Sequence, residues 1–355
     1  MCAIDYMVLS HFRQHQMKFT RLPYDLVDWQ RLDAFEDRTF SQRKAWLDFI
    51  CETQSGEPVV AQLTDGNETL GFFSGVRIKR MGFSIMGSPF PGWTTPYMGF
   101  NLAPGVSRTS AVSALIPFVF RDLKCHHLEI ADPFLDREDM VELGFHVRTG
   151  QTFRSDLTLP EDELFNRMDS ACRRCIRKAA KSGVTVEEAD AEGFPAEYYQ
   201  QLLDVFAKQD LKPTYRQERV EALIKHYHGT GNLLLLRARN ADGQSIATGI
   251  YPGFNKISFF WGNASFREHQ HVRPNETLHW HAMQHWKKRG IESHYWGNGG
   301  EYKRKYGGDQ VPFMEFRLSR GAATAVARDT AKALYFYGRN VRKHVLALTR
   351  SLLAT

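Results

Sequence analysis

The stretch PVVAQLTDGNETLGFF at residues 58–73 decides the fold of this chain, because it predicts a β-hairpin. Two strand-like runs flank the Asp-Gly turn at 65–66, and such tight turns need the positive φ that Asp and Gly tolerate. The stretch LLLLRARNADGQSIATGI at residues 233–250 repeats the pattern around a second Asp-Gly turn at 242–243. Two hairpins of one kind in one chain suggest a duplicated supersecondary unit.

The segments around the two hairpins support this duplication. Each hairpin follows a helical stretch and precedes a helix that leads into a strand. These segments are 42–50, 110–123 and 126–130 in the first half, and 220–228, 277–289 and 291–296 in the second. Chance recurrence of ordinary α/β alternation is the alternative. We predict an α/β (α+β) fold of tandem duplicated domains, each with a mixed central sheet flanked by helices.

Four parts follow along the chain. An N-terminal extension covers residues 1–16, the first domain 17–157, the second domain 158–320 and a basic amphipathic C-terminal helix 321–355. This tail holds six basic side chains and one acidic one, so most of the net charge of +6 lies there. Such a helix can pack on its own domain, pair with a partner or lie on an anionic membrane surface.

Composition narrows the class of protein further. A hydrophobic content of 43% suffices for well-filled cores. No apolar run reaches the roughly 18 residues that a membrane-spanning helix needs, and no secretory signal is recognisable at the start. Five cysteines at irregular spacing indicate a reducing compartment. We therefore expect a cytoplasmic protein, with a peripheral contact to the inner membrane face through residues 331–353 as a further option.

Metal and nucleophile motifs find little support in the sequence. Cys172 and Cys175 form a single CxxC on the apolar arc of a predicted helix, whereas a zinc ribbon needs a second pair. His281 and His285 lack the glutamate of an HExxH motif. The GxSxG, Walker and GxGxxG patterns are missing as well. We expect no metal site.

A helix predicted over residues 161–181 has two contrasting faces. Its apolar arc contains Leu164, Met168, Ala171, Cys172, Cys175 and Ala179. The opposite arc contains Arg173, Arg174, Arg177, Lys178 and Lys181. The acidic residues that could neutralise these cations come only after the helix, at 187–192. Such a face is either solvated or binds phosphates of an anionic partner.

A glycine-rich block at residues 297–308, GNGGEYKRKYGG, follows a predicted core strand. Its glycines permit a close backbone approach and positive φ. The cations and tyrosines between them suit an anionic or carbonyl-bearing ligand. An ordinary surface loop is the alternative, and the position behind a core strand favours a functional site.

Several motifs together resemble the Fem/GNAT superfamily. It comprises tandem GNAT-fold proteins such as the peptidoglycan interpeptide-bridge aminoacyltransferases. The motifs are SACRRCIRKA at 170–179, NAS at 263–265, RPNE at 273–276, YKRKYGG at 302–308 and, in the first half, GSPFPGWTTPY at 87–97. The resemblance spans about residues 17–318 and implies two GNAT-like domains that transfer an activated acyl group to an amine.

The resemblance also implies roles for individual residues. Lys303 matches a lysine that assists the chemistry and would stabilise the oxyanion. Glu301, or a histidine such as His279, would accept the proton, and Tyr302 would complete the catalytic group. The expected donor and phosphate contacts are Arg173, Arg177, Lys178, Arg273, Asn275 and Lys305. The expected acceptor contacts are Trp93, Tyr97, Trp261 and Tyr306.

The implied donor is a co-substrate, acyl-CoA or aminoacyl-tRNA, without a tightly bound cofactor. The position of the GNAT loop RxxGxG corresponds to residues 267–275, which contain no glycine and so depart from the usual coenzyme A site. We expect an N-acyltransferase acting on an amine of a cell-envelope, polysaccharide or small-metabolite acceptor. The alternatives are a tRNA-dependent Fem-type aminoacyltransferase and a non-catalytic module docked to a membrane by its C-terminal helix. The sequence leaves the oligomeric state open.

Overall fold

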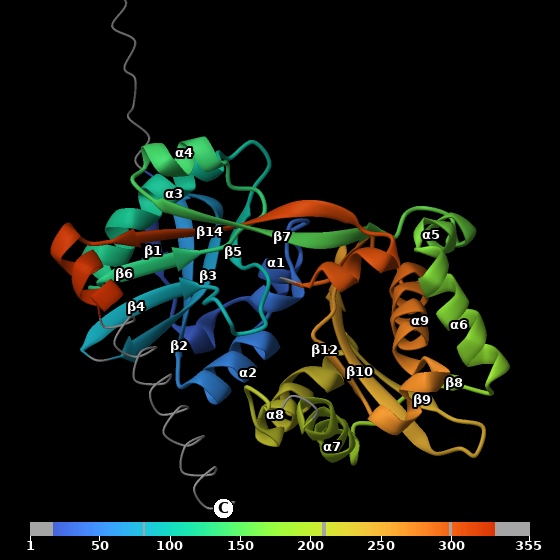
Figure 1. Cartoon of the computed structure of the whole chain (residues 1–355). Coiled ribbons are helices and arrows are strands. Elements are labelled where there is room, and N and C mark those ends of the chain that lie inside the picture. Colours follow the sequence, from blue (N-terminus) through green and yellow to red (C-terminus); the bar gives the residue numbers. More distant parts are fainter. Residues whose placement is uncertain (1–16, 81, 208–210, 298–299, 331–355) are drawn as a thin grey trace, which may run out of the picture.

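The computed structural model describes residues 17–80, 82–207, 211–297 and 300–330, which form two lobes side by side (Figure 1). The predicted extension 1–16 and residues 331–355 of the predicted C-terminal helix lie outside the described residues. Residues 322–330, at the start of that predicted helix, are helical.

The first lobe contains most of the elements in the first half of the chain. They are β1 (Lys18–Arg21), η1 (Tyr24–Leu26), α1 (Trp29–Asp33), η2 (Phe40–Gln42), α2 (Lys44–Gln54), β2 (Glu57–Asp65), β3 (Glu68–Arg80), β4 (Phe83–Ser88), β5 (Gly99–Leu102), α3 (Arg108–Pro117), η3 (Phe118–Asp122), β6 (His127–Ile130), α4 (Arg137–Glu142) and β7 (His146–Asp156).

The second half of the chain supplies the second lobe and one strand that returns to the first. Its elements are α5 (Glu161–Arg167), α6 (Ser170–Lys181), β8 (Thr185–Glu188), α7 (Phe194–Ala207), α8 (Gln217–Tyr227), η4 (His228–Thr230), β9 (Leu233–Arg239), β10 (Ser245–Phe254), β11 (Ile257–Phe259), β12 (Gly262–Ser265), η5 (Arg267–Val272), α9 (Pro274–Lys288), β13 (Ser293–Tyr295), η6 (Glu301–Tyr306) and β14 (Asp309–Ser319).

Both predicted hairpins are confirmed. β2 and β3 pair antiparallel across the first turn, and β9 and β10 pair antiparallel across the second. Gly66 and Gly243 have φ of 57° and 79°, which is the left-handed backbone that the Asp-Gly signal predicts. The order helix, hairpin, helix, strand also recurs, as α2-β2-β3-α3-β6 and as α8-β9-β10-α9-β13.

Each hairpin is buried on both faces, because helices cover both sides of its sheet. Along β9, Leu233 and Leu235 pack into one core with α7 and α8, while Leu234 and Leu236 pack into another with α9 and α6. β2 alternates in the same way: Val60 faces the core that contains α2. The core around α2 is continuous with the core around α7 and α8, so it belongs to both lobes.

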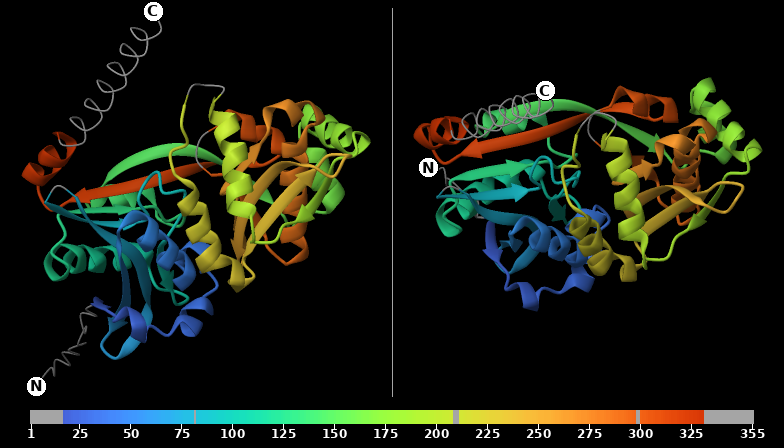
Figure 2. Two further views of the ribbon diagram at one scale, coloured as in Figure 1. Left: turned by 90° about the horizontal axis from the view of Figure 1, so that it is seen from below. Right: turned by 60° about the horizontal axis from the view of Figure 1, so that its bottom comes forward.

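Two long strands run from one lobe to the other. β14 pairs with β6 of the first lobe over residues 316–319 and with β7 over residues 309–317. β7 in turn pairs with β13 of the second lobe through residues 154–156. Figures 1 and 2 show these two strands side by side as they run between the lobes. The sheets of the two lobes are thereby joined into one continuous sheet.

One predicted element is wrong in its extent. The helix expected over 161–181 is two helices, α5 and α6, with a break at Met168-Asp169. The break arises because the N–H of Asp169 donates to the carbonyl of Lys305 at 3.0 Å instead of continuing the helix. On α6 the apolar face consists of Cys172, Ile176 and Ala179, while Ala171 is exposed.

Candidate active site between the lobes

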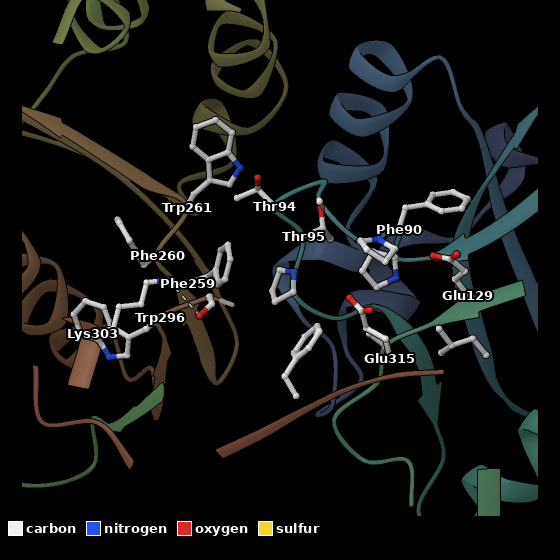
Figure 3. A pocket seen from close by; sticks show the side chains of 18 residues that line it. Phe90, Thr94, Thr95, Glu129, Phe259, Phe260, Trp261, Trp296, Lys303 and Glu315 are labelled. Carbon is white, nitrogen blue, oxygen red and sulfur yellow. Dashed lines mark hydrogen bonds between the residues drawn. The ribbon is translucent and has the colours of Figure 1, made fainter. Parts of the chain in front are cut away.

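A cavity of about 260 Å³ lies between the two lobes and is lined by both. The first lobe contributes the loop after β4, the end of β6 and the middle of β14. The second contributes the segment after β11, the end of β13 and η6. Figure 3 shows Lys303 and Trp296 on one side and Glu129, Glu315 and Phe90 on the other. The lining residues are Pro89, Phe90, Pro91, Gly92, Thr94, Thr95, Pro96, Glu129, Ile130, Ala131, Phe259, Phe260, Trp261, Trp296, Gly297, Lys303, Phe313 and Glu315.

Lys303 is the cation of the second-lobe wall. It lies in η6, where its side chain is only 7% exposed, and its Nζ donates to the carbonyl of Gly297 at 3.3 Å. The ammonium also lies 5.6 Å from the ring centre of Phe260. Burial lowers the pKa of Lys303 to about 8, because water no longer solvates the charge fully. The side chain is therefore a poorly hydrated cation beside an apolar wall.

The first-lobe loop at residues 89–96 is held by contacts from within its own lobe and from the second. Trp46 of α2 donates its indole N–H to the hydroxyl of Thr95 at 3.2 Å. Arg219 of α8 donates to the carbonyl of Trp93, and the Trp93 ring packs on Phe90 at 4.6 Å. The predicted acceptor-facing loop therefore does border the cavity, although Trp93 itself is outside the lining.

Trp261 is the predicted acceptor contact that reaches the cavity. It is 5% exposed, and its indole nitrogen has no hydrogen-bond partner among the described residues. The other two aromatic candidates are placed elsewhere. Tyr97 packs against Tyr295 at 5.5 Å, and Tyr306 stacks on Trp296 at 4.4 Å behind the wall.

The two carboxylates of the first-lobe wall were missed by the sequence reasoning. Glu129 of β6 and Glu315 of β14 line the cavity opposite Lys303 (Figure 3). Each lies in an ordinary strand far from the other in the sequence, so no local motif indicates them. Only the pairing of β6 with β14 brings them together.

The groups predicted to act beside Lys303 lie outside the lining. Glu301 is largely exposed and pairs with Arg304 at 2.7 Å, and Tyr302 is 58% exposed. His279 is buried behind Phe260, and its Nδ1 lies 3.0 Å from the hydroxyl of Tyr251. Burial lowers the pKa of His279 well below its ordinary value, so the ring is neutral. The roles of Glu301, Tyr302 and His279 stay predictions.

A second concave region lies on the outer side of the second lobe. Five cations and two small side chains line this groove: Arg174, Arg177, Lys178, Lys181 and Arg273, with Ala171 and Cys175. In the described part of the chain, none of the five lies within ion-pair distance of an acidic side chain, whereas nearby Arg167 pairs with Asp309. The cationic face of α6 thus meets Arg273, the residue that precedes α9, at a positively charged groove whose cations form no ion pair with the described residues.

Three further residues that were predicted to contact the donor lie outside the lining of this groove. Arg173 bonds the carbonyl of Asn166 at 2.5 Å. Asn275 donates to the hydroxyl of Ser265 at 3.1 Å. Lys305 pairs with Glu276 of α9 at 2.8 Å, which fastens η6 to the start of that helix. The structure therefore brings Arg177, Lys178 and Arg273 into one groove, separate from these three.

Among the described residues, no group of three or more His, Cys, Asp or Glu side chains is placed to hold a metal ion. Within the same residues, no helix is both long and apolar enough to cross a membrane.

Residues 166–304 match the family model of the acetyltransferase (GNAT) domain. No curated protein matches the chain. The fold is similar to that of FemX, with a TM-score of 0.66 and 14% identity over 84% of this chain and 96% of that one. It is also similar to a tandem GNAT protein from the clavulanic acid biosynthesis pathway, with a TM-score of 0.51 and 12% identity over 86% of this chain and 99% of that one.

Proposed function

We propose that this chain joins an activated acyl group to an amine in the cavity between its lobes, because residues 166–304 match the acetyltransferase (GNAT) domain and the fold is similar to those of FemX and a tandem GNAT protein. The donor is an acyl-CoA. The acceptor is an amine of a cell-envelope, polysaccharide or small-metabolite compound. The observation that carries the proposal is Lys303, a buried cation that lines this cavity.

Acyl transfer to an amine is assisted by a cation beside the acyl oxygen, and Lys303 would supply this cation in the cavity. The amine nitrogen attacks the acyl carbon and a C–N bond forms. The bond from carbon to the coenzyme A sulfur then breaks, and the proton that the amine loses ends on this sulfur, which leaves as the thiol. Negative charge develops on the acyl oxygen in between, and an ammonium group stabilises it. Apolar neighbours such as Phe260 and Trp296 strengthen this attraction, because they exclude water from the cavity wall.

The basic groove beside α6 supports an anionic donor. Its cations lack acidic partners among the described residues, and phosphate groups are the anions that acyl-CoA and aminoacyl-tRNA share. Residues 267–275 contain no glycine, which argues against the usual coenzyme A loop. This departure favours a second candidate, a tRNA-dependent aminoacyltransferase. Both candidates place the donor phosphates in the same groove.

The test uses the full chain with acetyl-CoA and, separately, with charged tRNA. We expect one donor to raise the melting temperature and its acyl group to appear on an added amine. Lys178→Glu, in the groove, should weaken donor binding about tenfold through charge repulsion, whereas Lys79→Glu, an exposed control in the first lobe, should bind as wild type.

Lys303→Ala separates binding from chemistry in the same assay. It should keep the donor-induced shift and lose transfer by about 100-fold or more, which is the usual effect of removing one oxyanion contact. No shift with either donor would contradict the proposal. Transfer by Lys303→Ala at the wild-type rate would remove the role of this residue.

A further inference from the structure

The acceptor side of the cavity carries a pair of negative charges. β6 and β14 pair in register, with Glu129 opposite Arg317. Because side chains alternate along a strand, Glu315 emerges on the same face as Arg317 and therefore beside Glu129. Both carboxylates are mostly buried, with side-chain exposures of 16% for Glu129 and 11% for Glu315, and both line the cavity.

The contacts of Glu315 use only one of its two oxygens. Oε2 accepts from Arg148 at 3.2 Å and from Arg317 at 3.1 Å. Oε1 receives no hydrogen bond from the described residues. Glu129 has its own neighbours, since Oε1 lies 3.3 Å from His127 and 3.8 Å from Arg317.

Among the described residues, these neighbours only partly offset the negative charge of Glu315. Arg317 is shared between the two carboxylates. Arg148 is 67% exposed, so water screens much of its charge. Among the described residues, Glu315 therefore faces the cavity with one shared guanidinium and one largely screened guanidinium beside it, and its Oε1 stays available for a donor.

The opposite wall has the opposite sign. Lys303 repels an ammonium group and so favours the neutral form of an amine beside it, which is the form that attacks a carbonyl. The first-lobe carboxylates attract an ammonium group. A molecule that satisfies both walls has a neutral nucleophilic amine at one end and a cation at the other.

We infer that the acceptor is a diamine or another amine with a second, cationic group, and that Glu315, assisted by Glu129, determines this specificity. The inference rests on the proposed function only in naming which end reacts. The carboxylate of Glu315 binds the cationic end through Oε1, and this contact places the other amine toward Lys303.

The test compares two probes that differ only at the far end, 1,5-diaminopentane and 5-amino-1-pentanol. Binding of each to the full chain at pH 7 is measured by calorimetry, and acetylation from acetyl-CoA is measured in parallel. Wild type should bind the diamine about tenfold more tightly, as expected for one charge-assisted hydrogen bond. Glu315→Gln, which keeps the shape, should abolish this preference and leave binding of the amino alcohol unchanged.

Two variants complete the design. Glu138→Gln removes the same charge from an exposed position of α4 and should behave as wild type. Glu129→Gln should reduce the preference as well, and it serves if Glu315→Gln does not fold.

The outcomes separate the two ideas. Equal binding of both probes by wild type, or a preference that survives in both cavity variants, overturns the inference. Acetylation of both probes at equal efficiency overturns it too but supports the proposed function. A preference for the diamine that depends on Glu315, without acyl transfer from acetyl-CoA or from charged tRNA, supports the inference and counts against the proposed function.

Discussion

At the scale of single residues, Lys303 lines the candidate active site, although its burial there disfavours the charged form of its side chain. The glycine-rich block predicted that this lysine would be placed at a site, since its pattern is local. Glu129 and Glu315 had no such signal, because each is one residue in an ordinary strand. Their proximity depends on the pairing of β6 with β14, which no local pattern reveals.

The lowered pKa of Lys303 predicts a pH dependence of stability. Burial brings this pKa to about 8, below its ordinary value of 10.5. Between these values the unfolded chain binds more protons, so this group makes the free energy of unfolding rise with pH across the window. Lys303→Met removes the buried charge and should raise the free energy of unfolding at pH 7 by roughly 1–3 kcal/mol.

Urea unfolding of wild type and Lys303→Met at pH 7 and at pH 10.5 measures this effect. The difference between the two proteins should shrink at the higher pH, where the folded wild type has lost its proton. A variant that is less stable than wild type at pH 7 would show that the ammonium contributes more through its contacts than burial costs it.

At the scale of elements, the break between α5 and α6 shows where local pattern fails. The apolar periodicity over 161–181 is continuous, so it predicts a single helix. In the structure α5 ends before Asp169, because the N–H of Asp169 donates a hydrogen bond to the carbonyl of Lys305. Gly307 then packs directly on the backbone of Arg167. A contact with η6, far along the chain, thus overrides a helical pattern.

This close approach predicts different costs for two similar glycines. Gly307 and Gly243 both have positive φ, 78° and 79°. A Cβ on Gly307 would lie 2.7 Å from the carbonyl carbon of Arg167, whereas a Cβ on Gly243 meets nothing within 4 Å. Gly243→Ala should cost about 1 kcal/mol for the backbone conformation alone. Gly307→Ala should cost about 1–3 kcal/mol more, because the backbone of Arg167 must shift.

Chemical unfolding of the two variants side by side measures the difference. Gly307→Ala should also slow acyl transfer, because η6 carries Lys303, and Gly243→Ala should leave it unchanged. Equal losses of stability would mean that the backbone of Arg167 moves aside at little cost.

At the scale of the whole molecule, the tandem plan was predictable and the strand exchange was not. The two hairpins and their flanking helices are local features, so the repeat could be read from periodicity and turn residues. The division into domains at residues 157–158 stays a prediction. β14, from the second half of the chain, pairs with β6 and β7 from the first half. Such long-range pairing cannot be predicted from local sequence patterns.

The shared core and the shared strands predict that both lobes unfold together. Phe40 of the first lobe stacks on Phe259 of the second at 5.7 Å, and Trp46 packs against Tyr227 at 5.5 Å. Unfolding one lobe alone would expose this core and break the pairing of β7 with β13. Such coupling favours one cooperative transition over two.

Hydrogen exchange in increasing urea tests this coupling, with β2 and β9 as reporters of the two lobes. Phe40→Ala, between the lobes, and Leu115→Ala, in the core of the first lobe only, should each cost about 2–5 kcal/mol. If the lobes are coupled, both variants lower the midpoints of β2 and β9 by the same amount, because either lobe can unfold only with the other. If Leu115→Ala instead lowers the midpoint of β2 and leaves β9 protected, the lobes are independent, and the strands that cross between them do not enforce cooperativity.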